Sequence, residues 1–530
     1  MYNKYLILTL SLFCLIIILP FIGIFSKLNF DFLSLLVFIS NTNILKIIYF
    51  TFYQAFFSAV LSCLIAIPFA LALNRHKNLT IIRYLVSICG FSFVIPSILI
   101  VYAVIKLFGI NGFYNNYFNF YELLEINSIY GLKAILIAHI LLNAPFATRL
   151  FFQNLDNIPN KYYEISSSLN LTFFGNIIKL EIPVIKQNLF SIFSIIFSLC
   201  FLSFAIVMVL GGSPLNSTIE VAIYQFALFE LNFNKAIFLS FIQIFICSIF
   251  IFIGFNKMKG SKYFEINNNK YTHPYKNYKF IKLIDYILIL ILSLFLFSPI
   301  VFIIFNFFYN GFIENILFTS EFFNALFNSL VISIITGLIV SILGLLITIL
   351  LIENYKNVII QQSLFLLTSS ILVISPVIFS LGYFIILGEY RYNNFFNFFV
   401  IILINSIFLI PFSILILFNN LKNIYLTYED FQKTFRIKSS DYYLIIFSLI
   451  KNNLLYVFAF SSVITFGDFT IISFFKNQNF ETLPSLLFKL ISAYRFNEAS
   501  FVAGFILVLS LIIYFFIDNI VYKLKPAKII

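Results

Sequence analysis

The chain has 530 residues, of which 62% are hydrophobic and 10% are charged, and its mean hydropathy is +1.03. Soluble domains carry about 25% charged residues, so this composition excludes a water-soluble globular fold. The formal net charge of +12 comes from basic residues in many short loops rather than in one dense patch, which indicates membrane orientation and not a nucleic-acid-binding surface.

The apolar stretches are long enough to cross a bilayer as helices, which takes about 20 residues each. We predict twelve spans and therefore an all-α polytopic membrane protein. The first six spans are predicted near residues 5–25, 48–74, 82–108, 131–152, 184–210 and 235–255. The second six are predicted near residues 280–306, 325–352, 362–388, 395–418, 450–475 and 499–521. Residues 5–25 are interpreted as a retained span and not a signal peptide, because the apolar run is long and no small-x-small cleavage site follows it.

Alternate loops are rich in lysine and arginine, and the positive-inside rule assigns such loops to the cytoplasm. The basic residues of these loops include Arg75, Arg83, Lys161, Lys179, Lys356 and Lys433. The opposite loops are mainly acidic and contain Glu122, Glu125, Glu220, Glu230, Glu314 and Glu321. The last outer loop is an exception, since it contains Lys476, Lys489 and Arg495. We expect both termini to be cytoplasmic.

Short matches recur in the same order along the chain at an offset of about 265 residues, which indicates an internal repeat. Pro145 and Phe146 match Pro411 and Phe412, and the third and ninth spans each contain a proline. The predicted organisation is a first six-helix unit over residues 1–255, a cytoplasmic linker over 256–278 and a second six-helix unit over 279–530. Tandem units of this kind are related by a pseudo-twofold axis along the membrane normal.

The chain contains no pattern typical of an active site or of a metal centre. All five cysteines lie in apolar stretches without a C-x-x-C pair, and none of the three histidines lies within a helical turn of another histidine or a cysteine. The phosphate-binding motif G-x-x-x-x-G-K-[ST] is also absent. We therefore expect no enzymatic activity, no metal and no bound cofactor, so a separate subunit must hydrolyse ATP if ATP drives the protein.

The polar loop between the fourth and fifth spans has a helical pattern. Pro159 marks a helix start, and Ile165, Leu169 and Phe173 recur every four residues as one apolar stripe on a short helix. Such a helix outside the membrane must bury its stripe, either in a groove of a partner protein or against its own bundle. The pattern alone leaves both alternatives open.

The same loop resembles the EAA loop of ABC importer permeases. Glu164 and Pro183 stand at the spacing of that motif, and Asn170 takes the place of its glycine; asparagine also tolerates a positive φ. A weaker second copy contains Asp430, Phe431, Phe435 and Arg436. The resemblance implies a permease of the bacterial inner membrane. It also implies two copies of an ATPase subunit that dock on these loops and hydrolyse ATP, and a periplasmic substrate-binding protein.

The fused double unit resembles the single-chain permeases of thiamine and ferric-iron importers. Residues 198–226 and 465–497 are similar to the thiamine permeases in particular, which implies import of thiamine or its phosphate esters. Ferric iron is the alternative substrate. An ion-coupled secondary transporter is a weaker alternative because it leaves the EAA-like loops unexplained, and a membrane enzyme lacks the required carboxylate or histidine clusters.

Three residues are candidates for the substrate pathway of a cationic, aromatic substrate. Asp468 lies in an apolar span, where a carboxylate is costly unless it faces water or a partner. Tyr53 and Tyr224 offer ring faces for a cation–π contact. Asp468 has a simpler interpretation, namely hydrogen bonds to the backbone at a helix break. Residues 218–229 and 482–494 are predicted to lie at the outer face and to receive the binding protein.

Overall fold

The computed structural model describes residues 2–28, 37–119, 128–212, 216–258, 275, 278–309, 319–353, 374–435, 439–477 and 480–523. Within these residues the chain forms helices and connecting turns, with one isolated β-bridge between Asn477 and Phe480. Several predicted features lie outside the described residues: most of the linker 256–278, Glu122, Glu125, Glu314, Lys356, Arg436 and the first part of the ninth span.

The helices of the first half include long spans and short connecting helices. They are α1 (Tyr2–Ser26), α3 (Thr42–Arg75), α4 (Thr80–Phe91), α5 (Ser97–Phe108), α6 (Phe113–Phe118), α8 (Leu132–Asp156), α9 (Asn160–Ser168), α10 (Phe173–Asn176), the π-helix η1 (Ile177–Glu181), α11 (Ile182–Phe201), α12 (Ala205–Leu210), α13 (Ile219–Leu228) and α14 (Phe233–Met258).

The second half repeats much of this order. Its helices are α15 (Lys279–Tyr309), α17 (Ser320–Glu353), α19 (Pro376–Leu387), the 3₁₀-helix η2 (Gly388–Tyr392), α20 (Asn394–Phe435), α21 (Ser439–Phe466), α22 (Thr470–Phe475), α23 (Leu483–Ser492) and α24 (Phe496–Lys523).

The all-α membrane fold predicted from composition is confirmed. Ten helices in the described part are long and apolar enough to cross a membrane, and shorter apolar helices such as α4, α19 and α23 accompany them. The predicted count of twelve spans is not confirmed.

Three spans that were predicted to be continuous are broken in the structure. The third span separates into α4 and α5, and Pro96 is the N-cap of α5 instead of lying inside a helix. Proline has no N–H to donate and disfavours helical φ and ψ at the preceding residue, so a helix does not continue through Pro96; α4 ends at Phe91, and a turn joins it to α5. The fifth and eleventh spans break at residues 202–204 and 467–469. Such breaks in apolar segments are tolerated where the backbone is buried in protein or lines a cavity.

The internal repeat is visible in the lengths of corresponding helices. α3 and α17 each have 34 residues, and α5 and α19 each have 12. After the two breaks, α12 and α22 each have six residues, and α13 and α23 each have ten. The turn that follows contains a left-handed residue in both halves, Leu231 at φ 51° and Tyr494 at φ 57°.

The described helices pack as two compact units. Unit 1 comprises residues 1–31, 223–244 and 307–530, and unit 2 comprises residues 32–222 and 245–306. The first helix of each sequence half therefore packs mainly with the other half: α1 belongs to unit 1 and most of α15 to unit 2. The units defined by packing therefore differ from the two halves defined by the sequence repeat. The domain boundaries that we predicted from the repeat stay a prediction.

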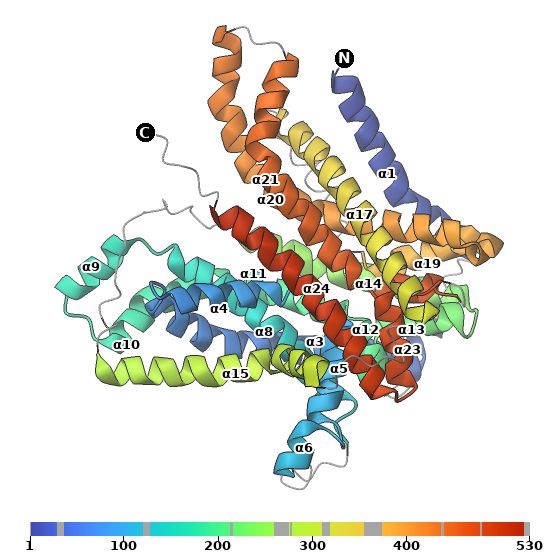
Figure 1. The fold of residues 1–530 in the computed structure, drawn as a ribbon, viewed down its shortest axis with the longest axis horizontal. Coiled ribbons are helices and arrows are strands. Elements are labelled where there is room, and N and C mark those ends of the chain that lie inside the picture. Colours follow the sequence, from blue (N-terminus) through green and yellow to red (C-terminus); the bar gives the residue numbers. More distant parts are fainter. Residues whose placement is uncertain are drawn as a thin grey trace. The chain divides into compact units, whose positions relative to one another are not determined.

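In unit 1, small residues let helices approach closely, which is typical of membrane bundles. α1 lies against α19 (Figure 1), where a Cβ added to Gly23 would lie 2.5 Å from the carbonyl oxygen of Gly382. α17 packs on α20 and α21, and Gly344 faces Ser413 there. The surrounding core is aliphatic and contains Val340, Ile352, Leu409, Leu417, Leu421, Ile446, Ile450 and Val457.

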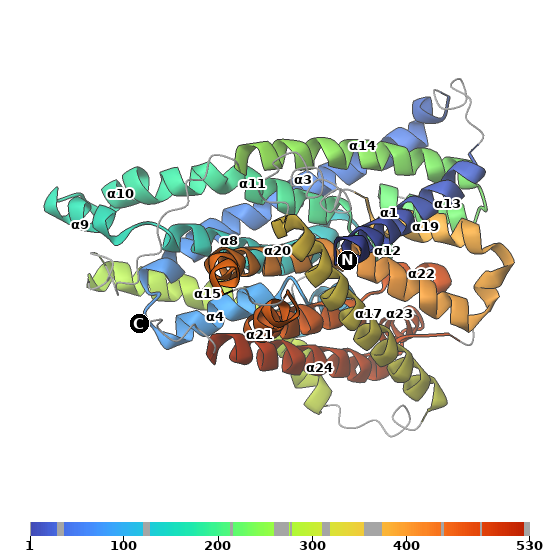
Figure 2. The same ribbon diagram turned by 90° about the horizontal axis from the view of Figure 1, so that it is seen from above.

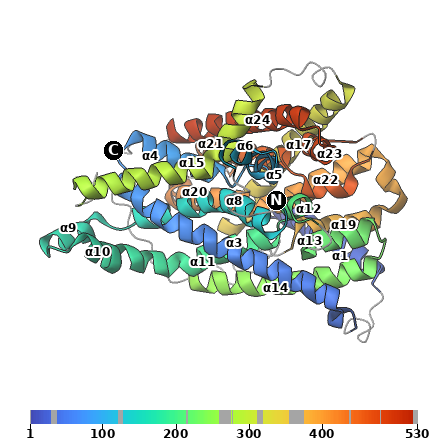
Figure 3. The same cartoon turned by 90° about the horizontal axis from the view of Figure 1, so that it is seen from below.

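In unit 2, α3 packs along α8 and α11 (Figure 2). α15 runs beside α4 (Figure 3), and its Ile289 and Leu296 join Phe69, Leu73 and Ile82 in one buried cluster. This arrangement brings the end of α3 and the beginning of α15 together at the end of the unit where α9 and α10 lie.

Candidate functional site

The first candidate site is the coupling segment, defined as residues 160–183, which joins α8 to α11. α9 begins at Asn160 after the N-cap Pro159, as predicted. Asn170 adopts φ 49°, so the predicted left-handed turn at the glycine position of the motif is also confirmed. Pro183 stands in the first turn of α11, as expected of a residue that opens a span.

The prediction of a single helix through Phe173 is wrong. α9 ends at Ser168, and α10 begins at Phe173 after the turn at Asn170. Thr172 stabilises this second start, because its side-chain oxygen accepts the N–H of Gly175 at 3.1 Å. A residue in the left-handed conformation ends a helix. The four-residue spacing of apolar residues therefore runs across a turn, and this turn separates Phe173 from Ile165 and Leu169.

The apolar side chains of the coupling segment are largely solvent-exposed. Ile165 is 54% exposed and Leu169 67%, and Glu164 is also exposed between Lys161 and Ile165. α9 and α10 lie beyond the end of α11 (Figure 2). An exposed apolar patch on short helices is the kind of surface that a partner protein covers.

The second copy of the motif has a different backbone. Asp430, Phe431 and Phe435 lie in α20, which continues to Phe435 without the break that separates α8 from α9. Their side chains and all of Arg436 lie outside the described part of the chain. The two halves therefore differ in the helix that carries the motif.

A buried charge cluster lies beside the coupling segment and consists of Arg75, His76, Glu181 and Asp285. Arg75 donates two hydrogen bonds to the Asp285 carboxylate, from Nε at 2.9 Å and from Nη2 at 2.5 Å. His76 Nε2 lies 3.1 Å from the same carboxylate, and Arg75 Nη1 lies 4.0 Å from Glu181 Oε2. All four residues are at most 7% exposed. Arg75 was predicted among the basic loop residues, whereas in the structure it ends α3 and its side chain is buried.

Asp468 occupies the break between α21 and α22. Its carboxylate accepts the backbone N–H groups of Thr470 at 3.0 Å and Ile471 at 3.3 Å, so it caps the first turn of α22. Asn405 of α20 also forms a side-chain hydrogen bond with it. The half-buried carboxylate thus has backbone partners in the described structure, and its predicted role towards substrate stays a prediction.

The corresponding break in the first half is held by a histidine. His139 of α8 is 1% exposed, and its ring nitrogens lie 2.9 Å from Ser58 Oγ and 3.0 Å from Ser203 Oγ. Ser203 stands in the break between α11 and α12, as Asp468 does between α21 and α22. In each half, a polar side chain from the span before the broken one therefore forms a hydrogen bond with the residue at the helix break. This side chain is His139 of α8 in the first half and Asn405 of α20 in the second.

The two predicted pathway tyrosines lie in different units. Tyr53 is half-buried on α3 and stacks between Tyr49 and Phe57, at centroid distances of 5.8 and 4.5 Å. Tyr224 is 5% exposed in α13, and its ring centroid lies 5.2 Å from that of Phe474 in α22. α22 therefore connects Tyr224 to Asp468 within unit 1, and the described contacts do not bring Tyr53 into this group.

The helices α13 and α23, which were predicted to lie at the outer face, begin in the same way. Thr51 Oγ1 of α3 accepts the N–H of Ile219 at 3.0 Å, and Ser329 Oγ of α17 accepts the N–H of Leu483 at 2.9 Å. Most side chains of both helices are buried, and the predicted position of residues 218–229 and 482–494 at the outer face, where they would receive the binding protein, stays a prediction. The exposed positions are concentrated in the turns that follow, with Phe229 71% and Tyr494 79% exposed.

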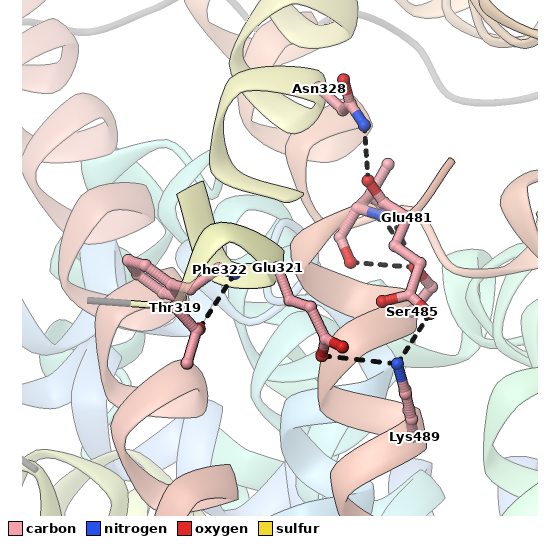
Figure 4. Close-up of polar contacts among 8 residues, drawn as sticks. Thr319, Glu321, Phe322, Asn328, Glu481, Ser485 and Lys489 are labelled. Atoms are coloured by element: carbon pink, nitrogen blue, oxygen red, sulfur yellow. Dashed lines mark hydrogen bonds and ion pairs between the residues drawn. The ribbon is translucent and has the colours of Figure 1, made fainter. Parts of the chain in front are cut away.

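Lys489 is the exposed charge on α23 (Figure 4). Its Nζ lies 3.1 Å from Glu481 and 3.5 Å from Glu321 of α17, while Asn328 donates to the Glu481 carbonyl at 2.8 Å. Partial burial lowers the pKa of Lys489, but its hydrogen bond to Glu481 and the charges of Glu481 and Glu321 outweigh this effect, so the net result is a raised pKa.

The residues of the charge cluster were missed by sequence reasoning. The available signal was Asp285, a carboxylate inside a predicted span, where a charge is costly unless it faces water or a partner. No group of three histidine, cysteine, aspartate or glutamate residues that suits a metal ion occurs among the described residues.

The sequence is similar to that of known membrane transport proteins. Residues 65–262, which contain the coupling segment, match the family described as "Binding-protein-dependent transport system inner membrane component". The thiamine transport system permease protein ThiP of Haemophilus influenzae is 30% identical over 485 residues, which cover 89% of this chain and 88% of that protein. The chain belongs to this family of binding-protein-dependent permeases.

Further relatives extend over nearly the whole permease. ThiP of Escherichia coli is 26% identical over 489 residues, covering 89% of this chain and 88% of the relative. ThiP of Brucella abortus is 26% identical over 502 residues, covering 92% and 90%. The predicted resemblance to a fused, double-unit permease is therefore confirmed, and the chain is a multi-pass membrane transport protein.

Proposed function

We propose that this permease translocates thiamine, or its phosphate esters, as the membrane subunit of an ATP-driven importer. The single observation that carries the substrate is the set of relatives named as thiamine transport permeases, which align over 89% of the chain. Ferric iron, the alternative from the sequence, has no separate support among these relatives.

The coupling segment supports the ATP-driven mechanism. Its exposed apolar residues Ile165 and Leu169 stand next to the exposed Glu164, on short helices that extend beyond the span α11. We assign this surface to the ATPase subunit, of which two copies bind the permease. A helix-in-groove contact of this type buries an apolar face and orients it with a few polar groups.

Delivery by a periplasmic binding protein completes the proposal. With both termini in the cytoplasm, α13 and α23 lie towards the outer face, and their following turns expose Phe229, Leu231 and Tyr494. We propose that these turns receive the binding protein. Photo-crosslinkers placed at Phe229 and Tyr494 then capture it, whereas a crosslinker at the buried Leu487 does not. Absence of crosslinks in a functional trapped complex contradicts this contact.

The substrate pathway of the proposal includes Asp468, Tyr53 and Tyr224. A carboxylate at a helix break can attract a cation in a water-filled pathway, and half-helix ends at such breaks are common in transporter sites. Aromatic faces then contribute roughly 0.5–2 kcal/mol each to contact with a cation.

The decisive experiment measures uptake of radiolabelled thiamine by proteoliposomes that contain the permease, its ATPase and its binding protein. We expect ATP-dependent uptake that stops when the ATPase carries an inactivating substitution in its catalytic glutamate. Uptake that continues without hydrolysis excludes the ATP-driven mechanism. Uptake of ferric iron in place of thiamine excludes the proposed substrate while retaining the transporter class.

A further inference from the structure

The charge cluster joins the two sequence halves at the coupling segment. Arg75 ends α3 and His76 follows it, Glu181 ends η1 in the coupling segment, and Asp285 lies in the first turns of α15, the first helix of the second half. The four residues thus come from three separate parts of the chain, all of them within unit 2.

Arg75 contacts the coupling segment on two sides. Its Cζ lies 5.3 Å from the centroid of the Phe173 ring in α10, and its Nη1 lies 4.0 Å from Glu181 in η1. A π turn holds about one residue more than an α turn, so η1 brings Glu181 towards the face on which Phe173 lies. The Arg75 guanidinium therefore lies near both the first residue of α10 and the last residue of η1.

The linker that leads into α15 also contacts the coupling segment directly. The Tyr275 hydroxyl donates to the carbonyl of Leu171, and its ring centroid lies 5.8 Å from that of Phe173. Four residues further along α15 from Asp285, Ile289 packs in the buried cluster with Phe69 and Leu73 of α3. The chain just before α15 is thus attached to the coupling segment, and α15 itself to the end of α3.

We propose that Arg75 is a positioning residue that holds the coupling segment to α15 and so transmits its movement from the first sequence half to the second. The proposal rests on the function proposed above, in which the ATPase docks on this segment. Separating buried charges leaves them unpaired in a low-dielectric site, which is strongly unfavourable, so Arg75 and its carboxylates move together.

The second half differs at the corresponding position: at the offset of 278 that relates the starts of α3 and α17 (320 minus 42), position 353 is Glu353 and not arginine.

The test compares Arg75→Gln with Lys77→Gln in proteoliposomes that contain the complete importer. Lys77 lies two residues after Arg75 and is a matched control because it is more exposed and its 2.6 Å ion pair is with Asp156 of α8 and not with α15. The measured quantity is the number of thiamine molecules imported per ATP hydrolysed. We expect Arg75→Gln to lower this ratio about fivefold or more, the range of ordinary allosteric coupling, and Lys77→Gln to leave it unchanged.

The ratio separates positioning from simple stability. A residue that only stabilises the fold changes the amount of active importer, so uptake and hydrolysis fall together and their ratio stays constant. A constant ratio in Arg75→Gln therefore overturns the proposal. If Arg75→Gln does not fold, the double variant Arg75→Gln/Asp285→Asn replaces it, since removing both charges leaves no unpaired carboxylate at Asp285, and the same drop in ratio is expected.

A second measurement does not depend on the substrate. Spin labels at Leu169 in the coupling segment and at Leu290 in α15, both exposed, are placed in a cysteine-free background. We expect one narrow distance distribution with and without ATP in the otherwise unaltered chain and a broadened one in Arg75→Gln. Unchanged distributions in Arg75→Gln overturn the proposal even if the importer does not transport thiamine, whereas failure of the unaltered importer to import thiamine refutes only the proposed substrate.

Discussion

Ser329 Oγ accepts the backbone N–H of Leu483 at 2.9 Å, so a hydroxyl of α17 caps the first turn of α23 from a neighbouring helix. Thr51 Oγ1 makes the same bond to Ile219 at 3.0 Å, from α3 to α13. Sequence comparison between the halves did not reveal this pair, because the two hydroxyl residues differ in type. The structure shows that both halves attach their outer helix to the second span by one side-chain cap.

We predict that Ser329→Ala destabilises the permease by about 1 kcal/mol, because the N–H of Leu483 is buried and loses its acceptor. Thr51→Val should have a similar effect on α13. The measurement is the thermal unfolding midpoint of the purified permease in detergent. Ser341→Ala is the matched control in α17, since Ser341 is exposed and bonds only the carbonyl of Leu338 in its own helix. Equal midpoints for the two alanine variants of α17 contradict the prediction.

Composition and span length were sufficient to predict the membrane fold, because a bilayer requires about 20 apolar residues per helix whatever their identity. Local rules predicted the helix start at Pro159, and the resemblance to the EAA loop implied the left-handed turn at Asn170. The break at residues 202–204 was not predicted, since hydropathy stays high across it and tertiary packing decides whether the helix continues. The break at residues 467–469 was foreseen only as one of two interpretations of Asp468. The Arg75–Asp285 pair was missed because the two residues are 210 positions apart.

The second prediction concerns the coupling segment. Glu164→Arg places a third basic residue near Lys161 and Lys179 and should weaken binding of the ATPase subunit by at least about fivefold, because like charges at an interface repel. The measurement is the amount of ATPase that co-purifies with the permease across a salt series. Glu230→Arg is the control, since Glu230 is equally accessible but lies in the turn after α13. Unchanged assembly and uptake in Glu164→Arg remove the case for docking at this segment.

The third prediction concerns the contact between α1 and α19. A Cβ on Gly382 would overlap the carbonyl oxygen of Pro20, a backbone atom that cannot turn away. We expect Gly382→Val to destabilise the permease by about 2 kcal/mol and to loosen α1, which increases proteolysis after residues 27 and 28. Ile385→Val is the control on the same helix, because it removes a methyl group without creating a clash. A wild-type unfolding midpoint in Gly382→Val would falsify the close approach of these helices.

The fourth prediction uses the ion pairs of Lys489. The side chains of Lys489 and Glu321 are 50% and 61% exposed, so solvent screens the pairs and Lys489→Gln should cost no more than about 0.5 kcal/mol at neutral pH. The pKa of Lys489 is raised in the folded state, so its stabilisation is fully present below 10.5 and is lost as the pH rises through the higher folded value. Unfolding midpoints of Lys489→Gln and the unaltered chain should therefore converge in strongly alkaline buffer. A gap that widens with pH contradicts this.

The fifth prediction separates two roles of Asp468. The carboxylate caps α22, and an asparagine side-chain oxygen at this position keeps an acceptor for Thr470 or Ile471 while removing the charge. If Asp468 also faces the substrate pathway, as we propose, Asp468→Asn should leave the unfolding midpoint nearly unchanged but raise the KM for thiamine uptake about fivefold, which corresponds to about 1 kcal/mol of screened charge attraction. Asp468→Ala loses both functions and should also lower the midpoint, by about 1 kcal/mol. Uptake kinetics and thermal unfolding of the same preparations distinguish the outcomes. An unchanged KM in Asp468→Asn means that the residue only stabilises the helix break. The cation must then be attracted elsewhere along the pathway.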